Sequence, residues 1–213
     1  MKTTNLLLLI CLGLTLNACS TAYYGTMEKV GIEKRDILVS RVQGSVDAQN
    51  DAKEVFVSAL DRFNAVVDYD GGDLEKMYKR LSKDLEKSRD KADEVNHRIE
   101  KVEQVADDLF KEWKKELKGY DSADLRRSSA EQLKKTEART DDLIATMKKT
   151  AATMDPVLTR FNDQVLYLKH NLNAQALAGI RGEAKKVKSD VSALIASMEK
   201  SIAEAEAFIR DMQ

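Results

Sequence analysis

A heptad repeat of apolar residues over residues 74–118 constrains the fold of this chain more than any other feature. With Leu74 in the d position, eleven of the twelve a and d positions are apolar, if tyrosine and alanine are counted as apolar. Such a repeat over six heptads predicts one long helix with a coiled-coil seam, which must pack against other helices. The d row is Leu74, Leu81, Ser88, Val95, Val102 and Leu109, and the a row is Tyr78, Leu85, Ala92, Ile99, Ala106 and Trp113.

Turn residues delimit this helix and the one before it. Apolar residues at helical spacing predict a first helix over about residues 27–67. The sequence Asp-Tyr-Asp-Gly-Gly-Asp at 68–73 predicts a turn, with Asp73 as the N-cap of the second helix. Gly119 predicts the end of the second helix, and either Asp121 or Ser122 is expected to cap the third.

Residues 123–213 contain two breaks in the helical pattern. Asp155-Pro156 predicts a kink or a restart, because proline lacks a backbone N–H and disfavours helix at the residue before it. The apolar spacing then slips over residues 173–182, a run that contains two glycines. It resumes over 187–212 with three apolar rows, which are typical of a helix with two neighbours.

Two arrangements of these segments are open. If the slip is a turn, four helices of similar length form an up-down-up-down bundle about 60–70 Å long. The alternative is one kinked helix over residues 123–213, whose apolar C-terminal half would then need a partner chain. We favour the bundle. The predicted fold class is therefore all-α, with long antiparallel, coiled-coil-like helices in an up-and-down bundle of three or four helices.

The composition excludes several other classes of protein. The chain has 35 basic and 36 acidic residues, which give a net charge of −1 and no concentrated basic face for nucleic acid. No stretch alternates apolar and polar residues between turn residues, so we expect no strands. The two cysteines, Cys11 and Cys19, both lie near the N-terminus and predict no disulfide framework.

The start of the chain is typical of a bacterial lipoprotein signal. Its apolar run, residues 6–16, is too short to span about 30 Å of hydrocarbon, and small Ala18 precedes Cys19 as a secretory cleavage site requires. Residues 16–19, Leu-Asn-Ala-Cys, resemble the lipobox, whose cysteine receives a diacylglyceryl group. The alternative is an ordinary signal peptide with an incidental cysteine.

These observations predict three segments: a lipoprotein signal peptide at 1–18, a lipidated tether at 19–26, and one elongated helical bundle domain at 27–213. Lipidation is expected at Cys19, which would hold the protein in the membrane. Ser20, rather than an aspartate, follows the cysteine and resembles the class sorted to the outer membrane. The expected location is therefore the outer membrane, facing the periplasm.

Two stretches of the helical region resemble a known family. They are Glu33-Lys-Arg-Asp-Ile-Leu-Val-Ser-Arg-Val42 and Leu168-Lys-His-Asn-Leu-Asn-Ala-Gln-Ala176. Behind a lipobox, they resemble the bacterial lipoproteins grouped as domain of unknown function 2959. The resemblance implies a helical envelope lipoprotein over nearly the whole mature chain, and it implies no activity or site residue.

Candidate chemical sites are few. Glu94 and His97 match the Glu-x-x-His element of di-iron bundles, but such bundles use two copies and this chain has one. The heptad also places both residues away from the seam, which predicts a solvated helix face. His170 is expected to be a partly exposed histidine at a helix end or turn. We therefore expect no catalytic residue, no cofactor and no metal site.

The sequence thus favours a non-enzymatic scaffold or adaptor with protein partners in the cell envelope, self-association included. A second hypothesis is a carrier that binds a lipid or another apolar ligand within the bundle. It depends on the methionines at helical spacing, since methionine fills adaptable apolar surfaces. The residues concerned are Met147, Met154, Met198 and Met212.

Overall fold

The computed structural model describes residues 34–213, apart from 69–70, 72 and 172–173. The signal peptide at 1–18, the lipidation of Cys19 and the tether at 19–26 lie outside the described residues and stay predictions. The same holds for the first part of the helix expected over 27–67, before Lys34.

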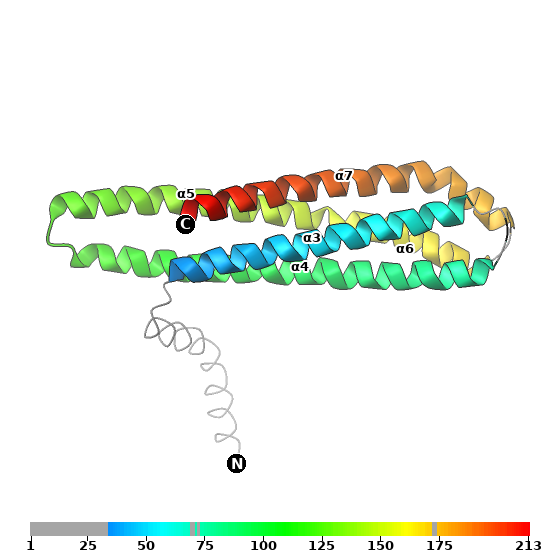
Figure 1. The fold of residues 1–213 in the computed structure, drawn as a ribbon, viewed down its shortest axis with the longest axis horizontal. Helices are drawn as coiled ribbons and strands as arrows, with labels where there is room; N and C mark the ends of the chain where they lie inside the picture. Colours follow the sequence, from blue (N-terminus) through cyan, green and yellow to red (C-terminus); the bar gives the residue numbers. More distant parts are fainter. Residues whose placement is uncertain (1–33, 69–70, 72, 172–173) are drawn as a thin grey trace, which may run out of the picture.

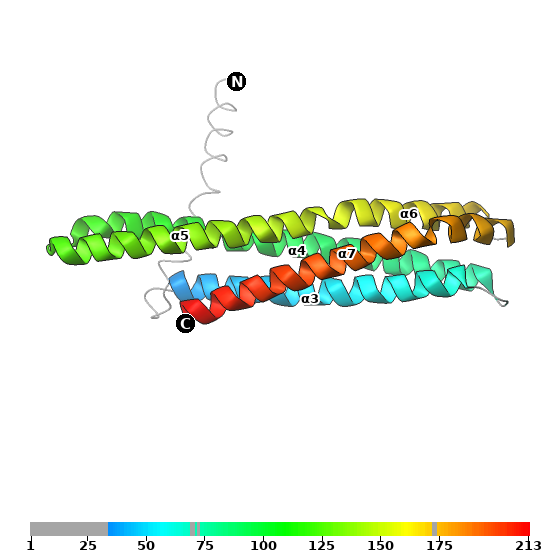
Figure 2. The ribbon, with the colours of Figure 1, turned by 90° about the horizontal axis from the view of Figure 1, so that it is seen from above.

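The described chain folds into a long bundle of antiparallel helices (Figures 1 and 2). Its elements are α3 (Lys34–Val67), α4 (Leu74–Glu116), the 3₁₀ turn η1 (Leu117–Gly119), α5 (Ala123–Ala152), α6 (Met154–His170) and α7 (Ala174–Met212). Helices α5 and α6 follow one another along one side of the rod, so they act as a single broken helix (Figure 1). The predicted all-α, up-and-down bundle is confirmed, with four long helices.

Each long helix packs against two others. Helix α3 contacts α4 and α7, and the broken helix α5–α6 closes the ring by contacting both α4 and α7. Helix α4 has 43 residues and is therefore about 65 Å long, which sets the length of the rod. The hairpin between α4 and α5 extends beyond the first described turn of α3 and the last turn of α7 (Figure 1).

The predicted helix caps are present. The Asp73 side chain accepts a hydrogen bond from the backbone N–H of Lys76 at 2.9 Å, and the Ser122 hydroxyl accepts one from Leu125 N–H at 3.3 Å. Each cap satisfies one of the backbone donors that a helix start leaves without a partner. In the turn between α3 and α4, Gly71 has φ of 148°, a conformation that favours glycine.

The break between α5 and α6 lies just before the proline. Thr153 leaves the helix, and its hydroxyl donates to the carbonyl oxygen of Thr150 at 2.6 Å. Pro156 then lies in the first turn of α6, where a missing N–H costs no helical hydrogen bond. The predicted restart at 155–156 is confirmed, displaced by two residues.

The turn before the last helix is shorter than predicted. Helix α7 begins at Ala174, so most of the run 173–182 is helical rather than turn. Gly179 is explained by packing, because a Cβ there would lie 3.1 Å from Cε1 of Tyr167 on α6. Since α7 folds back along α3, the alternative of one kinked helix over 123–213 is wrong.

The predicted seam of α4 forms its buried stripe. Its eight central positions, from Leu81 to Ala106, are at most 3% exposed. Near the end of α4, Leu109 is partly exposed whereas Phe110 is buried. A straight helix drifts by about 20° per heptad from a strict seven-residue repeat, so the buried stripe moves by about one position over several heptads.

The prediction that Trp113 is a core residue needs correction. Its ring packs against the core but is only partly buried, near the end of α4. Its Nε1–H donates to the Ser129 hydroxyl at 2.8 Å and so links α4 to α5. The reason is its place near the end of α4, where it lines an open groove together with Arg35 of α3 and Met212 of α7, so that part of the ring stays in contact with solvent.

We expect Trp113→Ala to lower the free energy of unfolding by about 2 kcal/mol, below the 3–5 kcal/mol of a fully buried tryptophan, because part of the ring already contacts water. The matched control is His97→Ala on the exposed face of α4, with an expected change within about 0.5 kcal/mol. Urea unfolding followed by circular dichroism measures both. Equal losses in the two variants would contradict the observed packing of α4.

Candidate functional site

The predicted pair Glu94 and His97 does not form a metal site. His97 is exposed, with Nδ1 at 4.0 Å from Oε2 of Glu100, while the Glu94 carboxylate contacts Lys91 and Arg98 instead. Among the residues that the structure describes, no three His, Cys, Asp or Glu side chains lie together in a way that would hold a metal ion. His170 is the last residue of α6 and is exposed.

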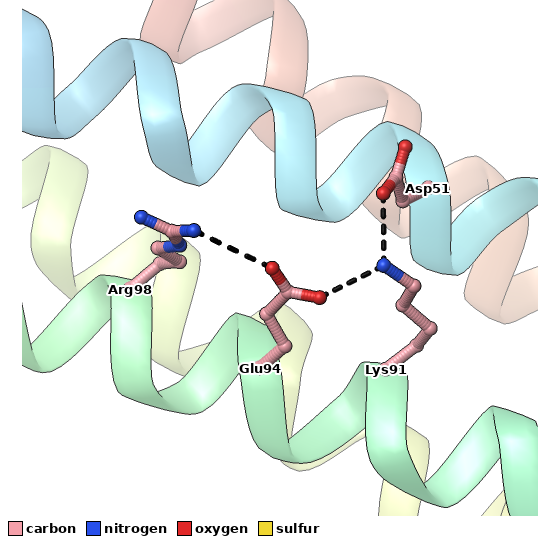
Figure 3. A network of polar contacts seen from close by, with 4 residues as sticks. All are labelled: Asp51, Lys91, Glu94 and Arg98. Carbon is pink, nitrogen blue, oxygen red and sulfur yellow. Dashed lines mark hydrogen bonds and ion pairs between the residues drawn. The ribbon is translucent and has the colours of Figure 1, made fainter.

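Glu94 belongs instead to a network of charges between α3 and α4 (Figure 3). Nζ of Lys91 lies 2.9 Å from Oδ2 of Asp51 on α3 and 2.8 Å from Oε2 of Glu94. Nη2 of Arg98 lies 3.5 Å from Oε1 of Glu94. The heptad predicts Glu94 on a solvated helix face away from the seam; its side chain is in fact partly buried, with 36% exposed, and Lys91 links it to Asp51 on α3.

This network shifts the pKa of two of its members. Hydrogen bonds to Asp51 and then Glu94 raise the pKa of Lys91 above its usual 10.5. The hydrogen bond from Lys91, followed by the one from Arg98, lowers the pKa of Glu94 below its usual 4.5. Both shifts favour the charged forms of Lys91 and Glu94.

The centre of the bundle holds a few polar side chains. Ser45 and Gln49 on α3 are fully buried, and the Gln49 amide donates to the Ser45 carbonyl oxygen at 3.4 Å. The Ser45 hydroxyl donates to Sδ of Met147 at 3.7 Å. On α4, the buried Ser88 hydroxyl donates to the backbone oxygen of Asp84 at 2.8 Å, within its own helix.

The methionines of the carrier hypothesis mostly belong to the core. Met147, Met154 and Met198 are 0% exposed, and none of them lines either groove described below. Met212 is partly exposed and lines the groove at the end of α7. The carrier hypothesis stays a prediction.

The surface feature with the clearest chemical character is a groove of about 570 Å³ between the end of α3 and the start of α4. We call it the cationic groove. It lies beside the turn at 68–73, at the end of the rod opposite to the first described residue, Lys34 (Figure 1). Its lining residues are Arg62, Ala65, Val66, Met77, Arg80 and Lys83.

Charge and apolar surface are separated in the cationic groove. Val66 is buried and Met77 partly buried, so they form an apolar floor, whereas the three cations are exposed. Nη1 of Arg62 lies 3.0 Å from Oδ2 of Asp84, a carboxylate that is only 11% exposed. This contact is an ion pair without hydrogen-bond alignment, since that oxygen accepts no hydrogen bond from a described residue.

Sequence reasoning missed this groove. Arg80 and Lys83 lie three residues apart on α4, outside the heptad seam, and look like any solvated charges. Only the turn at 68–73 brings Arg62 to the same place. A second groove, of about 420 Å³, has mixed charge and lies near the other end of the bundle; it is lined by Arg35, Leu109, Glu112, Trp113, Glu116, Gln132, Thr136, Asp211 and Met212.

The fold and these surfaces define an elongated, all-helical protein whose described part carries grooves and charged faces on its surface. No helix in that part is long and apolar enough to cross a membrane. The chain belongs to the family described as protein of unknown function DUF2959, which it matches over residues 23–212. Neither a curated protein nor a solved structure matches it.

We expect Lys91→Met to lower the free energy of unfolding by up to about 1 kcal/mol at neutral pH, because exposed ion pairs contribute little. The contribution of Glu94 is complete above its ordinary pKa of 4.5 and is lost as the pH falls through its lowered folded value. The contribution of Lys91 is complete below 10.5 and is lost as the pH rises through its raised value.

Urea unfolding of the wild-type protein and of Lys91→Met across the pH range measures the difference between their free energies of unfolding. This difference should be constant between about pH 5 and pH 10 and should shrink on either side. A difference that grows on acidification would contradict the network.

Proposed function

We propose that this protein is a lipid-anchored helical scaffold or adaptor of the outer membrane, facing the periplasm, without catalytic activity. The observation that carries the proposal is an elongated helical bundle, with α4 about 65 Å long, which follows a lipobox-like sequence in the same chain. A rod of this kind can hold a binding surface at a fixed distance from an anchor.

The chain between the proposed anchor and the bundle is short. Fifteen residue steps separate Cys19 from Lys34, the first described residue of α3. Fully extended, they reach about 50 Å, so the end of the bundle where α3 begins would stay within that distance of the bilayer. The turn between α3 and α4, with the cationic groove, lies at the opposite end (Figure 1).

The surface chemistry is consistent with an adaptor. The described helices carry many exposed ion pairs, such as Lys114–Glu137 and Arg139–Asp211, both between different helices. Pairs of this kind keep a rod soluble and contribute little stability. Partners would bind along exposed faces or at an end of the rod, and we expect them to be proteins of the envelope.

Fractionation of cell envelopes tests the anchor. We expect the wild-type protein in the outer-membrane fraction and Cys19→Ala in the soluble periplasmic fraction, because this substitution removes the thiol that would carry the lipid. A clickable palmitate analogue should label the wild-type protein and leave Cys19→Ala unlabelled.

Variants at the neighbouring residue are the matched controls. Ser20→Ala should remain in the outer membrane, whereas Ser20→Asp should move to the inner membrane, since the residue after the cysteine is expected to direct sorting. Cys19→Ala that stays membrane-bound, or wild-type protein absent from membranes, would contradict the proposal.

A further inference from the structure

The cationic groove has a surplus of positive charge that the bundle itself does not use. Among the described residues that line it, three of six are cations and none is a carboxylate. Asp84 beside it pairs with Arg62, and neither Arg80 nor Lys83 forms an ion pair with another described residue. In a chain with a net charge of −1, this local excess is not explained by composition.

The three cations of the groove lie on two different helices. Arg80 and Lys83 are three residues apart on α4, which places them one above the other on the same helix face. Arg62 stands on α3, on the opposite side of the apolar floor formed by Val66 and Met77. An occupant with carboxylates on both sides of an apolar stripe would match both rims and the floor.

We propose that the cationic groove is a docking site for an acidic amphipathic helix of a partner protein. Glutamates or aspartates at positions i and i+3 or i+4 of the partner helix would pair with Arg80 and Lys83. Another acidic residue, on the opposite side of the partner's apolar stripe, would pair with Arg62. Apolar side chains of the partner would cover the exposed Ala65 and the partly buried Met77, with Val66 beneath them. Methionine adapts to partners of different shape.

Two features favour a peptide over a lipid. The floor is short and open, so it offers no enclosed channel for an acyl chain, whereas helix-in-groove binding needs only a few anchoring side chains. The groove also lies at the end of the rod opposite to the start of α3 (Figure 1). Under the proposed function, on which this inference rests for its biological setting, that end faces away from the bilayer.

The test uses the full chain with Cys19→Ala, so its result does not depend on lipidation. The probe is a fluorescent peptide of about 14 residues with Glu and Leu spaced at i, i+3 and i+4, and binding is followed by fluorescence anisotropy. We expect saturable binding that weakens as salt is added, because exposed charges are screened. The same peptide with Lys in place of Glu should not bind.

Charge reversal then locates the binding. Arg80→Glu with Lys83→Glu should weaken binding by about tenfold or more, since it places like charges against the peptide. The matched control is Lys115→Glu with Lys118→Glu, an equal change in charge at exposed residues of the other end, which should change binding less than twofold. If circular dichroism shows that the Arg80→Glu, Lys83→Glu variant is unfolded, the neutral variant Arg80→Gln with Lys83→Gln replaces it in the same binding assay.

Four outcomes would overturn the proposal. If the peptide does not bind the unreversed chain, or binds both charge-reversed variants equally, the groove is not its site. Vesicles of phosphatidylglycerol that bind through Arg80 and Lys83 when the peptide does not would assign the groove to lipid. Sedimentation showing dimers that the groove variant abolishes, without peptide binding, would assign it to a second copy. None of these outcomes bears on the fractionation of Cys19→Ala.

Discussion

The burial of the apolar stripe of α4, which runs from Leu81 to Phe110 along a helix about 65 Å long, determines how the other helices pack. One neighbouring helix is too narrow to cover the stripe of α4. A pair of helices would also leave the remaining apolar rows of each helix exposed to water. Helix α3 covers one side of the stripe and the broken helix α5–α6 the other, and α7 closes the ring. The described residues contain no cysteine, so this packing alone must offset the entropy of ordering the chain.

Where the pattern is strong and local, the sequence was a sufficient guide. The heptads of α4, the turn at 68–73 and the caps at Asp73 and Ser122 all depend on residues close together in the chain, and each is confirmed. The end of α4 was less predictable, because the drift of a straight helix exchanges Leu109 for Phe110 in the buried stripe. The apolar spacing of one helix does not show at which residue its buried stripe departs from a strict heptad repeat.

Other features depended on contacts between distant residues. The two glycines in 173–182 suggested a turn, but Gly179 is inside a helix and makes room for the Tyr167 ring. The cationic groove is of the same kind, since Arg62 meets Arg80 and Lys83 only after the hairpin has formed. Charges outside an apolar seam look alike in sequence, and their convergence follows from the register of the two helices.

The packing of α7 against α3 completes the bundle, and the distance between spin labels on Glu54 and Lys200 measures this packing. Both residues are exposed and neighbour the Lys53–Glu199 ion pair, whose Nζ and Oε1 lie 3.9 Å apart. Electron–electron double resonance on labelled chains diluted with unlabelled protein should give a mean distance below about 30 Å, because packed helix axes lie about 8–10 Å apart. A distance near 65 Å, roughly that expected if α7 continued straight beyond α6, would contradict this packing. A short distance that disappears on dilution would also contradict it, because the two labels would then lie on different chains.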